Sequence, residues 1–101
     1  MNDNVLIDHL AQQVLGWGVG PDRFLTGNRS WIPKWRFNPL EHLEDAFKLL
    51  DNSKSTRYAI SQSAAAFEVE VECGGSIGKA SGHLKPRTIT LAVARSLGLE
   101  V

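Results

Sequence analysis

The clearest pattern along the chain is the alternation of apolar and acidic residues in AFEVEVEC, residues 66–73, which is strict from Phe67 onward. Successive side chains of a β-strand point to opposite faces of its sheet. One face of this strand would carry Phe67, Val69, Val71 and Cys73, and the other Glu68, Glu70 and Glu72. The pattern predicts a strand that packs on a core with one face and meets water with the other.

Two neighbouring segments predict further strands. RYAISQ at 57–62 precedes the alternating strand and SIGKASG at 76–82 follows it, with Gly74 and Gly75 in the second turn. Strands joined by such short connections are antiparallel neighbours, because parallel neighbours need a long crossover. The sequence therefore predicts a three-stranded antiparallel sheet with one face open to solvent.

Apolar residues recur at helical spacing in three segments, at residues 3–15, 39–50 and 86–97. At the start of the second helix, Asn38 suits the N-cap, Pro39 the first helical position, and Glu41 the position that reaches back in a capping box. The resulting order is α-α-β-β-β-α. It predicts one small α+β domain over residues 1–101, with the helices packed on the sheet.

Residues 17–37 have no clear periodicity and are predicted to form a long loop. Loops of this length are often functional. Its aromatic residues are Trp17, Phe24, Trp31, Trp35 and Phe37. Its cations are Arg23, Arg29, Lys34 and Arg36, and its only acid is Asp22, so four cations minus one anion leave a local charge of +3.

Two of these aromatic residues are predicted to be structural: Trp17 would seal the core after the first helix, and Phe37 would pack on the second helix. Trp31 and Trp35 leave two interpretations open. They would either fold over the core as a lid or stand exposed beside the cations. In the second case the predicted binding residues are Arg23, Arg29, Trp31, Lys34, Trp35 and Arg36.

The overall charge limits the classes of partner. Eleven Lys and Arg balance eleven Asp and Glu, so the whole molecule has no net charge with which to hold nucleic acid or an anionic membrane.

The opening MNDNVLIDHLAQQ has no secretion-signal pattern, and no stretch approaches the roughly 18 apolar residues of a membrane span. The single cysteine fits a reducing compartment. We expect a protein of the cytosol without a membrane partner.

Catalytic and metal motifs are weak. CGGSIGKAS at 73–81 differs from a phosphate-binding loop at both ends and is better explained as a hairpin. His9, His42 and His83 lie in separate elements without metal-ligand spacing. Cys73 shares the inward face of its strand and is expected to be a core residue. We therefore expect no enzyme activity, metal or cofactor.

Several short stretches resemble the phage ABA sandwich domain family. They are LAQQVLGW at 10–17, FNPLEHLEDAFKLLD at 37–51 and TITLAVARSLG at 88–98, the last after the alternating strand. The resemblance implies a bacteriophage or prophage origin, a layered α/β fold and no catalytic motif to carry over. The chain departs from the family in the Trp- and Arg-rich residues 17–37 and in Lys85-Pro86-Arg87 before the last helix.

The functional expectation is a non-catalytic binding protein. A phage product of this kind would act on a host or defence protein, as a counter-defence or anti-CRISPR-like inhibitor.

Glu68, Glu70 and Glu72 would either solvate the open sheet face or offer a secondary acidic surface to a basic partner. The alternative is a nucleic-acid or signalling-nucleotide module that uses residues 23–36. Residues 39–97 also have the α-β-β-β-α order of a double-stranded RNA-binding domain, with Lys79, Lys85 and Arg87 towards the last helix. The oligomeric state is left open.

Overall fold

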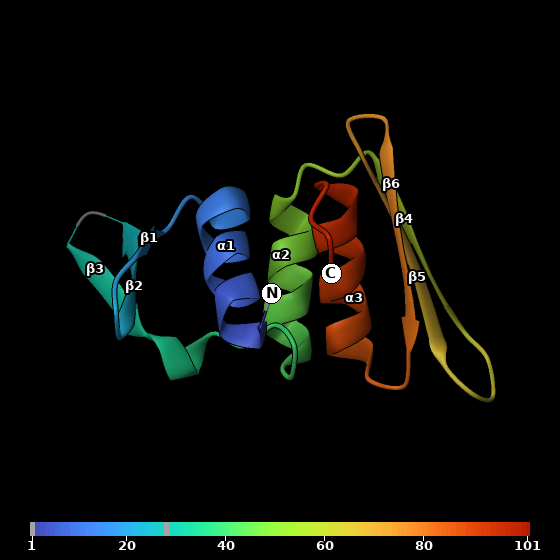
Figure 1. Ribbon diagram of the computed structural model, residues 1–101, viewed down its shortest axis with the longest axis horizontal. Coiled ribbons are helices and arrows are strands. Elements are labelled where there is room, and N and C mark those ends of the chain that lie inside the picture. The colour runs from blue at the N-terminus through green and yellow to red at the C-terminus, as the bar shows by residue number, and fades with distance from the viewer. Residues whose placement is uncertain (1, 28) are drawn as a thin grey trace.

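The computed structural model describes residues 2–27 and 29–101 and shows two antiparallel sheets with three helices between them (Figure 1). The helices are α1 (Asp3–Leu15), α2 (Leu43–Asn52) and α3 (Lys85–Ser96), with a short 3-10 helix η1 (Lys34–Arg36). The small sheet is β1 (Gly18–Val19), β2 (Arg23–Gly27) and β3 (Ser30–Pro33), and the large sheet is β4 (Arg57–Gln62), β5 (Phe67–Cys73) and β6 (Ser76–Gly82). The α+β class is confirmed.

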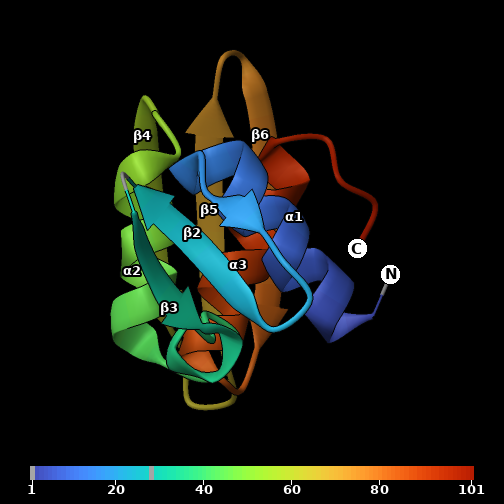
Figure 2. The ribbon, with the colours of Figure 1, turned by 90° about the vertical axis from the view of Figure 1, so that its left-hand side faces the viewer.

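The predicted three-stranded sheet is present as β4-β5-β6, but a second sheet was not predicted, because residues 17–27 and 29–37 do not form the long loop expected of them. They form the small sheet β1-β2-β3 and then η1. The small sheet and the large sheet occupy opposite ends of the molecule, and the helices lie between them (Figures 1 and 2). The small sheet is hard to recognise in the sequence because β1 has only two residues and β3 only four.

The large sheet follows its predicted pattern. β5 pairs antiparallel with β4 on one side and β6 on the other. Val69 and Val71 are buried under the helices, while the glutamates of β5 lie on the open face. Helix α3 approaches β6 closely at Gly78, where a Cβ atom would overlap the main chain of Ala92 and Ser96. Glycine at this position therefore allows close contact between helix and sheet.

The predicted start of the second helix is wrong. Helix α2 begins at Leu43, and Asn38 sits in a preceding turn, where its carbonyl accepts hydrogen bonds from the N–H groups of Glu41 and His42. Asp45, rather than Glu41, reaches back to the N–H of Asn38, at 2.9 Å. Pro39 and Leu40 are buried, so this segment enters the core before the helix begins.

The core consists of two apolar clusters, and the helices contribute residues to both. One is centred on α1 and extends from Phe24 of the small sheet to Leu49 of α2 and Ala94 of α3. It is closed by Trp17, whose ring centroid is 5.7 Å from that of Phe24 and 5.0 Å from that of Phe37. The other lies between α2, α3 and the large sheet. The structural role predicted for Trp17 is thus confirmed. Phe37 is buried, but it packs against Trp17 and Phe24, and the helix start on which it was expected to pack lies further along the chain. Within residues 2–27 and 29–101 no helix has the length and apolar character to cross a membrane.

Candidate functional site

The β2–β3 hairpin sorts its residues between two faces. Phe24 pairs with Ile32 and points into the core, where Phe24 is fully buried. Leu25 pairs with Trp31, and since cross-strand partners share a face, both lie on the outer side of the small sheet. Their exposed fractions are 52% for Leu25 and 51% for Trp31. The hairpin therefore presents an apolar pair to solvent.

Arg23 completes this outer face. Its guanidinium carbon lies 4.3 Å from the centroid of the Trp31 ring, which is a cation–π contact, and its Nε donates to Asp22 at 3.1 Å. That hydrogen bond from Arg23 lowers the pKa of the Asp22 carboxyl. We call Arg23, Leu25 and Trp31 the hairpin face. Leu25 was not among the predicted site residues, although the alternation around Phe24 could have indicated that it faces outward.

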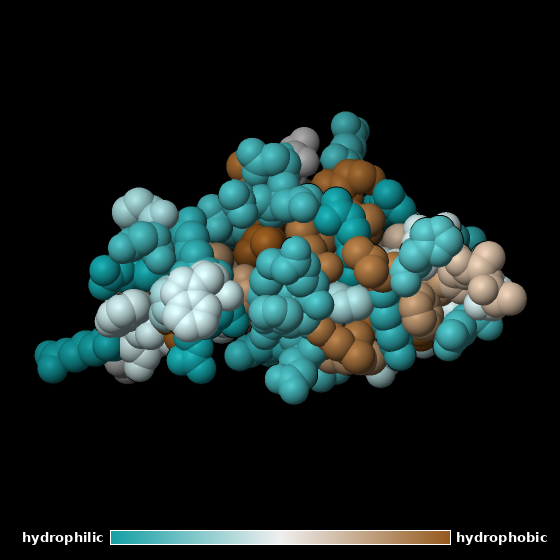
Figure 3. Space-filling view, turned by 90° about the horizontal axis from the view of Figure 1, so that it is seen from below, coloured by the Kyte–Doolittle hydropathy of each residue, from teal (hydrophilic) through white to brown (hydrophobic). Residues whose placement is uncertain are grey.

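Trp35 lies apart from the hairpin face, in η1. It is 76% exposed, so the lid interpretation is wrong for Trp35, as it is for the half-exposed Trp31. Trp35 borders a groove of about 430 Å³ whose other wall is the start of α1, including Asn4 and Asp8. At this end the molecular surface is mostly polar or near neutral in hydropathy, whereas apolar residues show over the middle (Figure 3).

The predicted cations have different environments. Lys34 is half-buried, donates to Asp8 at 3.0 Å, and lies 5.5 Å from the Phe24 ring centroid. It therefore fastens η1 to α1. Arg29 has a φ of 62° beside the hairpin turn, and Arg29 and Arg36 are both exposed. The structure thus brings Arg23 and Trp31 together, ties Lys34 to the scaffold, and leaves Arg29, Trp35 and Arg36 on the surface.

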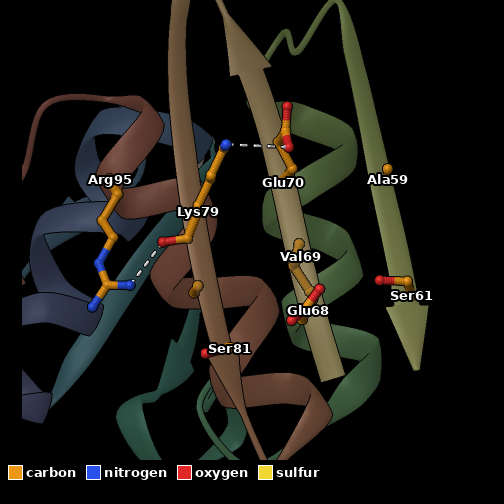
Figure 4. A pocket seen from close by; sticks show the side chains of 9 residues that line it. Ala59, Ser61, Glu68, Val69, Glu70, Lys79, Ser81 and Arg95 are labelled. Carbon is orange, nitrogen blue, oxygen red and sulfur yellow. Dashed lines mark hydrogen bonds and ion pairs between the residues drawn. The ribbon is translucent and has the colours of Figure 1, made fainter. Parts of the chain in front are cut away.

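The carboxylates of β5 lie on the open face of the large sheet, where Figure 4 shows Glu68 and Glu70. Glu72 accepts from Arg57 at 3.0 Å, and Glu70 lies 3.8 Å from the Nζ of Lys79. Three carboxylates minus these two cations leave one negative charge. Glu68 is flanked by Ser61 and Ser81 at the edge of a shallow hollow of about 440 Å³. The acidic surface is thus weaker than the sequence predicts, because cross-strand cations offset it.

The groups considered for chemistry occupy structural positions. Cys73 is half-buried, and its thiol donates to the carbonyl of Ser53 and accepts from the Ser96 hydroxyl. Gly74 and Gly75, with φ of 56° and 87°, form the β5–β6 hairpin turn rather than a phosphate loop. In the described part of the chain no three His, Cys, Asp or Glu side chains gather as metal ligands would.

The cations considered for double-stranded RNA are also engaged. Arg87 donates to both carboxylate oxygens of Asp3, at 3.1 Å each, and Lys85 lies 5.8 Å from the Phe67 ring centroid. Together with the Lys79–Glu70 pair, these contacts leave Lys85 as the one of the three cations without an acidic partner among the described residues.

A solved structure has a similar fold. A crystal structure of a phage protein from Bacillus cereus ATCC 14579 matches with a TM-score of 0.81 over 100% of this chain and 92% of that chain, at 14% sequence identity. The likeness at this identity concerns the fold. No protein-family model and no curated protein matches the sequence.

Proposed function

We propose that this chain is a non-catalytic, phage-type binding protein that holds a protein partner with its hairpin face. The observation that carries the proposal is the half-exposed pair of Leu25 and Trp31, with Arg23 stacked on the indole. Trp and Arg dominate the binding energy of protein interfaces, because a large rigid ring and a planar cation lose little entropy while burying much surface. The small sheet holds both groups in place before binding.

The charge around the hairpin face indicates the chemistry of the partner. Arg29 and Arg36 are exposed in the same segment, whereas Lys34 is paired with Asp8. A partner with an apolar pocket for Trp31 and a rim of carboxylates would complement this arrangement. Combined with the fold shared with a phage protein, this supports a host or defence protein of the bacterial cytosol as the partner, and a counter-defence role such as an anti-CRISPR-like inhibitor.

The second candidate is a nucleic-acid or nucleotide partner, which the exposed Trp35 beside Arg36 favours. An exposed indole next to a cation can stack a base and neutralise a phosphate. The paired state of Lys34 weakens this alternative because it removes one of the cations that would hold the backbone.

The test compares single truncations in one binding assay. The tagged protein captures partners from a lysate of the bacterium that carries the gene, with and without nuclease, and the Kd of the captured protein is then measured. We expect Trp31→Ala to weaken that Kd by about 2 kcal/mol or more. The control, Leu84→Ala, removes another exposed apolar side chain, which lies away from the hairpin face, and should leave the Kd unchanged.

The nucleic-acid alternative has its own readout. Trp31→Phe and Trp35→Phe variants are titrated with single-stranded DNA, RNA and cyclic nucleotides at low and high salt. Tight quenching of Trp35 that weakens steeply with salt would favour this alternative and refute the protein-partner proposal, because counterion release makes phosphate binding depend on salt. Loss of the captured partner after nuclease treatment would also refute the protein-partner proposal.

A further inference from the structure

Strand β4 forms an outer edge of the large sheet (Figure 2). The N–H of Ser63 donates to the carbonyl of Ala66 at 2.9 Å, which fixes the alternation of the β4–β5 ladder. Since inward and outward pairs alternate in an antiparallel ladder, Ala59 and Ser61 direct their main-chain groups to β5. Tyr58, Ile60 and Gln62 therefore direct theirs away from the sheet. Among the described residues these outward groups have no main-chain or side-chain partner.

The two edges of the large sheet differ. At β6, the guanidinium of Arg95 donates from Nη1 to the carbonyl of Lys79 at 2.7 Å and from Nε to the main-chain oxygen of Val101 at 2.9 Å. The bond to Lys79 covers part of that edge. Residues 58–62 of β4 contain no charge and no proline, which are the usual devices that keep an edge from pairing. The only charge of the strand is Arg57, which Glu72 holds at its end.

An apolar strip borders the β4 edge on its helix-facing side. Tyr58 is 49% exposed, and Ile60 is half-buried against the cluster that also contains Phe47 of α2. Helix α2 and β4 lie on the same side of the molecule (Figure 2). A second strand added to β4 would cover this strip as well as the free main-chain groups.

We propose that β4 pairs with β4 of a second copy, antiparallel about a two-fold axis at Ile60, to form a continuous six-stranded sheet. The outward residues 58, 60 and 62 are spaced evenly about Ile60. Ile60 would therefore face the partner's Ile60, and Tyr58 would face the partner's Gln62, with about six main-chain hydrogen bonds formed. The contact is isologous, which means that the same strand edge is used on both copies.

The charges are compatible with this pairing. Arg57 would face the partner's Ser63, and the two arginines would lie about 20 Å apart at opposite ends of the paired strands. On the open face Ala59 would face the partner's Ser61, so that small side chains meet. The net charge of zero means that two copies do not repel each other at long range.

The first test measures the molar mass by sedimentation equilibrium over a wide range of concentration. We expect a reversible change from 11.1 kDa to twice that mass. Gln62→Pro removes one outward N–H at a position that an edge strand tolerates, and Ile60→Lys places two like charges on the axis. Both should shift the association constant at least tenfold towards monomer. Ile77→Lys, the same exchange on the exposed face of β6, should leave it unchanged.

A wild-type protein that stays at 11.1 kDa at all concentrations would overturn the proposal. A wild-type association constant in folded Gln62→Pro protein, with the fold judged by circular dichroism, would overturn it too, because the dimer would then form through another surface. All of these substitutions lie outside the hairpin face. A failure here therefore leaves the proposed function untouched, and the loss of partner binding in Trp31→Ala leaves the dimer untouched.

The second test fixes the register by disulfide formation in a Cys73→Ala background. Ala59→Cys and Ser61→Cys proteins are oxidised separately and as a mixture. With the axis at Ile60, positions 59 and 61 of the two copies are opposite each other as a non-hydrogen-bonded pair, where Cβ atoms come close enough for a disulfide. We expect the mixed dimer to form fastest. Faster formation of the Ala59→Cys homodimer would overturn the axis at Ile60.

Discussion

Gly78 provides the sharpest test of the packing between α3 and the large sheet. A Cβ atom at this position would overlap the main chain at Ala92 and Ser96 and would lie 2.9 Å from the carbonyl carbon of Arg95. Main-chain atoms of a helix cannot rotate away as a long side chain can. Ala92 and its neighbours Ile89 and Val93 are fully buried, so the helix is held from both sides. Gly78→Ala must therefore push α3 away from β6 as a unit.

The size of the effect follows from that displacement. Ordinary contact returns only after α3 moves by roughly 1 Å, and a gap of that size forfeits a quarter to a half of the dispersion energy at the separated surfaces. We expect a loss of at least about 3 kcal/mol in the free energy of unfolding, at the upper end for overpacked cores. In urea this corresponds to a midpoint lower by about 1–3 M.

The assay is urea denaturation followed by circular dichroism, with Gly27→Ala as the matched control. Gly27 lies in the exposed part of β2, and within the described residues its added Cβ would meet no atom closer than 4 Å. The free energy of unfolding of the Gly27→Ala protein should differ from that of wild type by less than about 1 kcal/mol. A Gly78→Ala protein within about 1 kcal/mol of wild type would refute the close approach of α3 to β6.

Two further predictions concern buried and exposed polar contacts. Thr90 is fully buried and donates its hydroxyl to the carbonyl of Pro39 at 2.8 Å, so Thr90→Val should cost about 1–3 kcal/mol in thermal denaturation, and Thr90→Ser should cost less because it keeps the donor. The hydrogen bond from Arg87 lowers the pKa of Asp3, so this carboxylate adds stability above its unfolded pKa, and the contribution is lost as pH falls through the lowered folded pKa. NMR titration should give Asp3 a pKa below its ordinary value that returns towards it in Arg87→Gln; an ordinary value in the wild type would contradict the contact.

The large sheet was predictable because one strand carries an unambiguous pattern. The period-2 alternation of β5 fixes its faces, and the short connections then fix its neighbours. The small sheet was not predictable because its strands are too short for periodicity to emerge, and because Pro33 and the glycines in this segment are typical of loops. The same reason explains why Trp31 was predicted as a binding residue and Leu25 was not. A tryptophan beside cations indicates a binding site by its residue type, whereas an outward-facing leucine is indicated only by the alternation of its strand.

The start of α2 was predicted too early, because tertiary contacts outweigh the local preferences of these residues. Asn38-Pro39-Leu40-Glu41 has the residue types of a helix start, yet Pro39 and Leu40 are buried. Burying Leu40 alone is worth about 1.5–3 kcal/mol, which exceeds the roughly 1 kcal/mol of an N-cap. The pairing of Lys34 with Asp8 was hidden for a related reason: 26 residues separate them, and nothing in either segment signals the other.

The two proposed surfaces have a joint consequence, because they lie on different sheets. The hairpin face belongs to the small sheet, at the far end of a molecule 43 Å long from the large sheet that carries β4 (Figure 1). Pairing through β4 would therefore leave both hairpin faces uncovered, and the dimer would present two equal sites. Two linked sites hold a multivalent partner far more tightly than one, because the second contact forms at a high effective concentration. Gln62→Pro should then weaken binding to an immobilised partner, where both sites engage, while its affinity for the same partner free in solution should remain that of the wild type. Equal loss in both formats would mean that the edge strand itself contacts the partner.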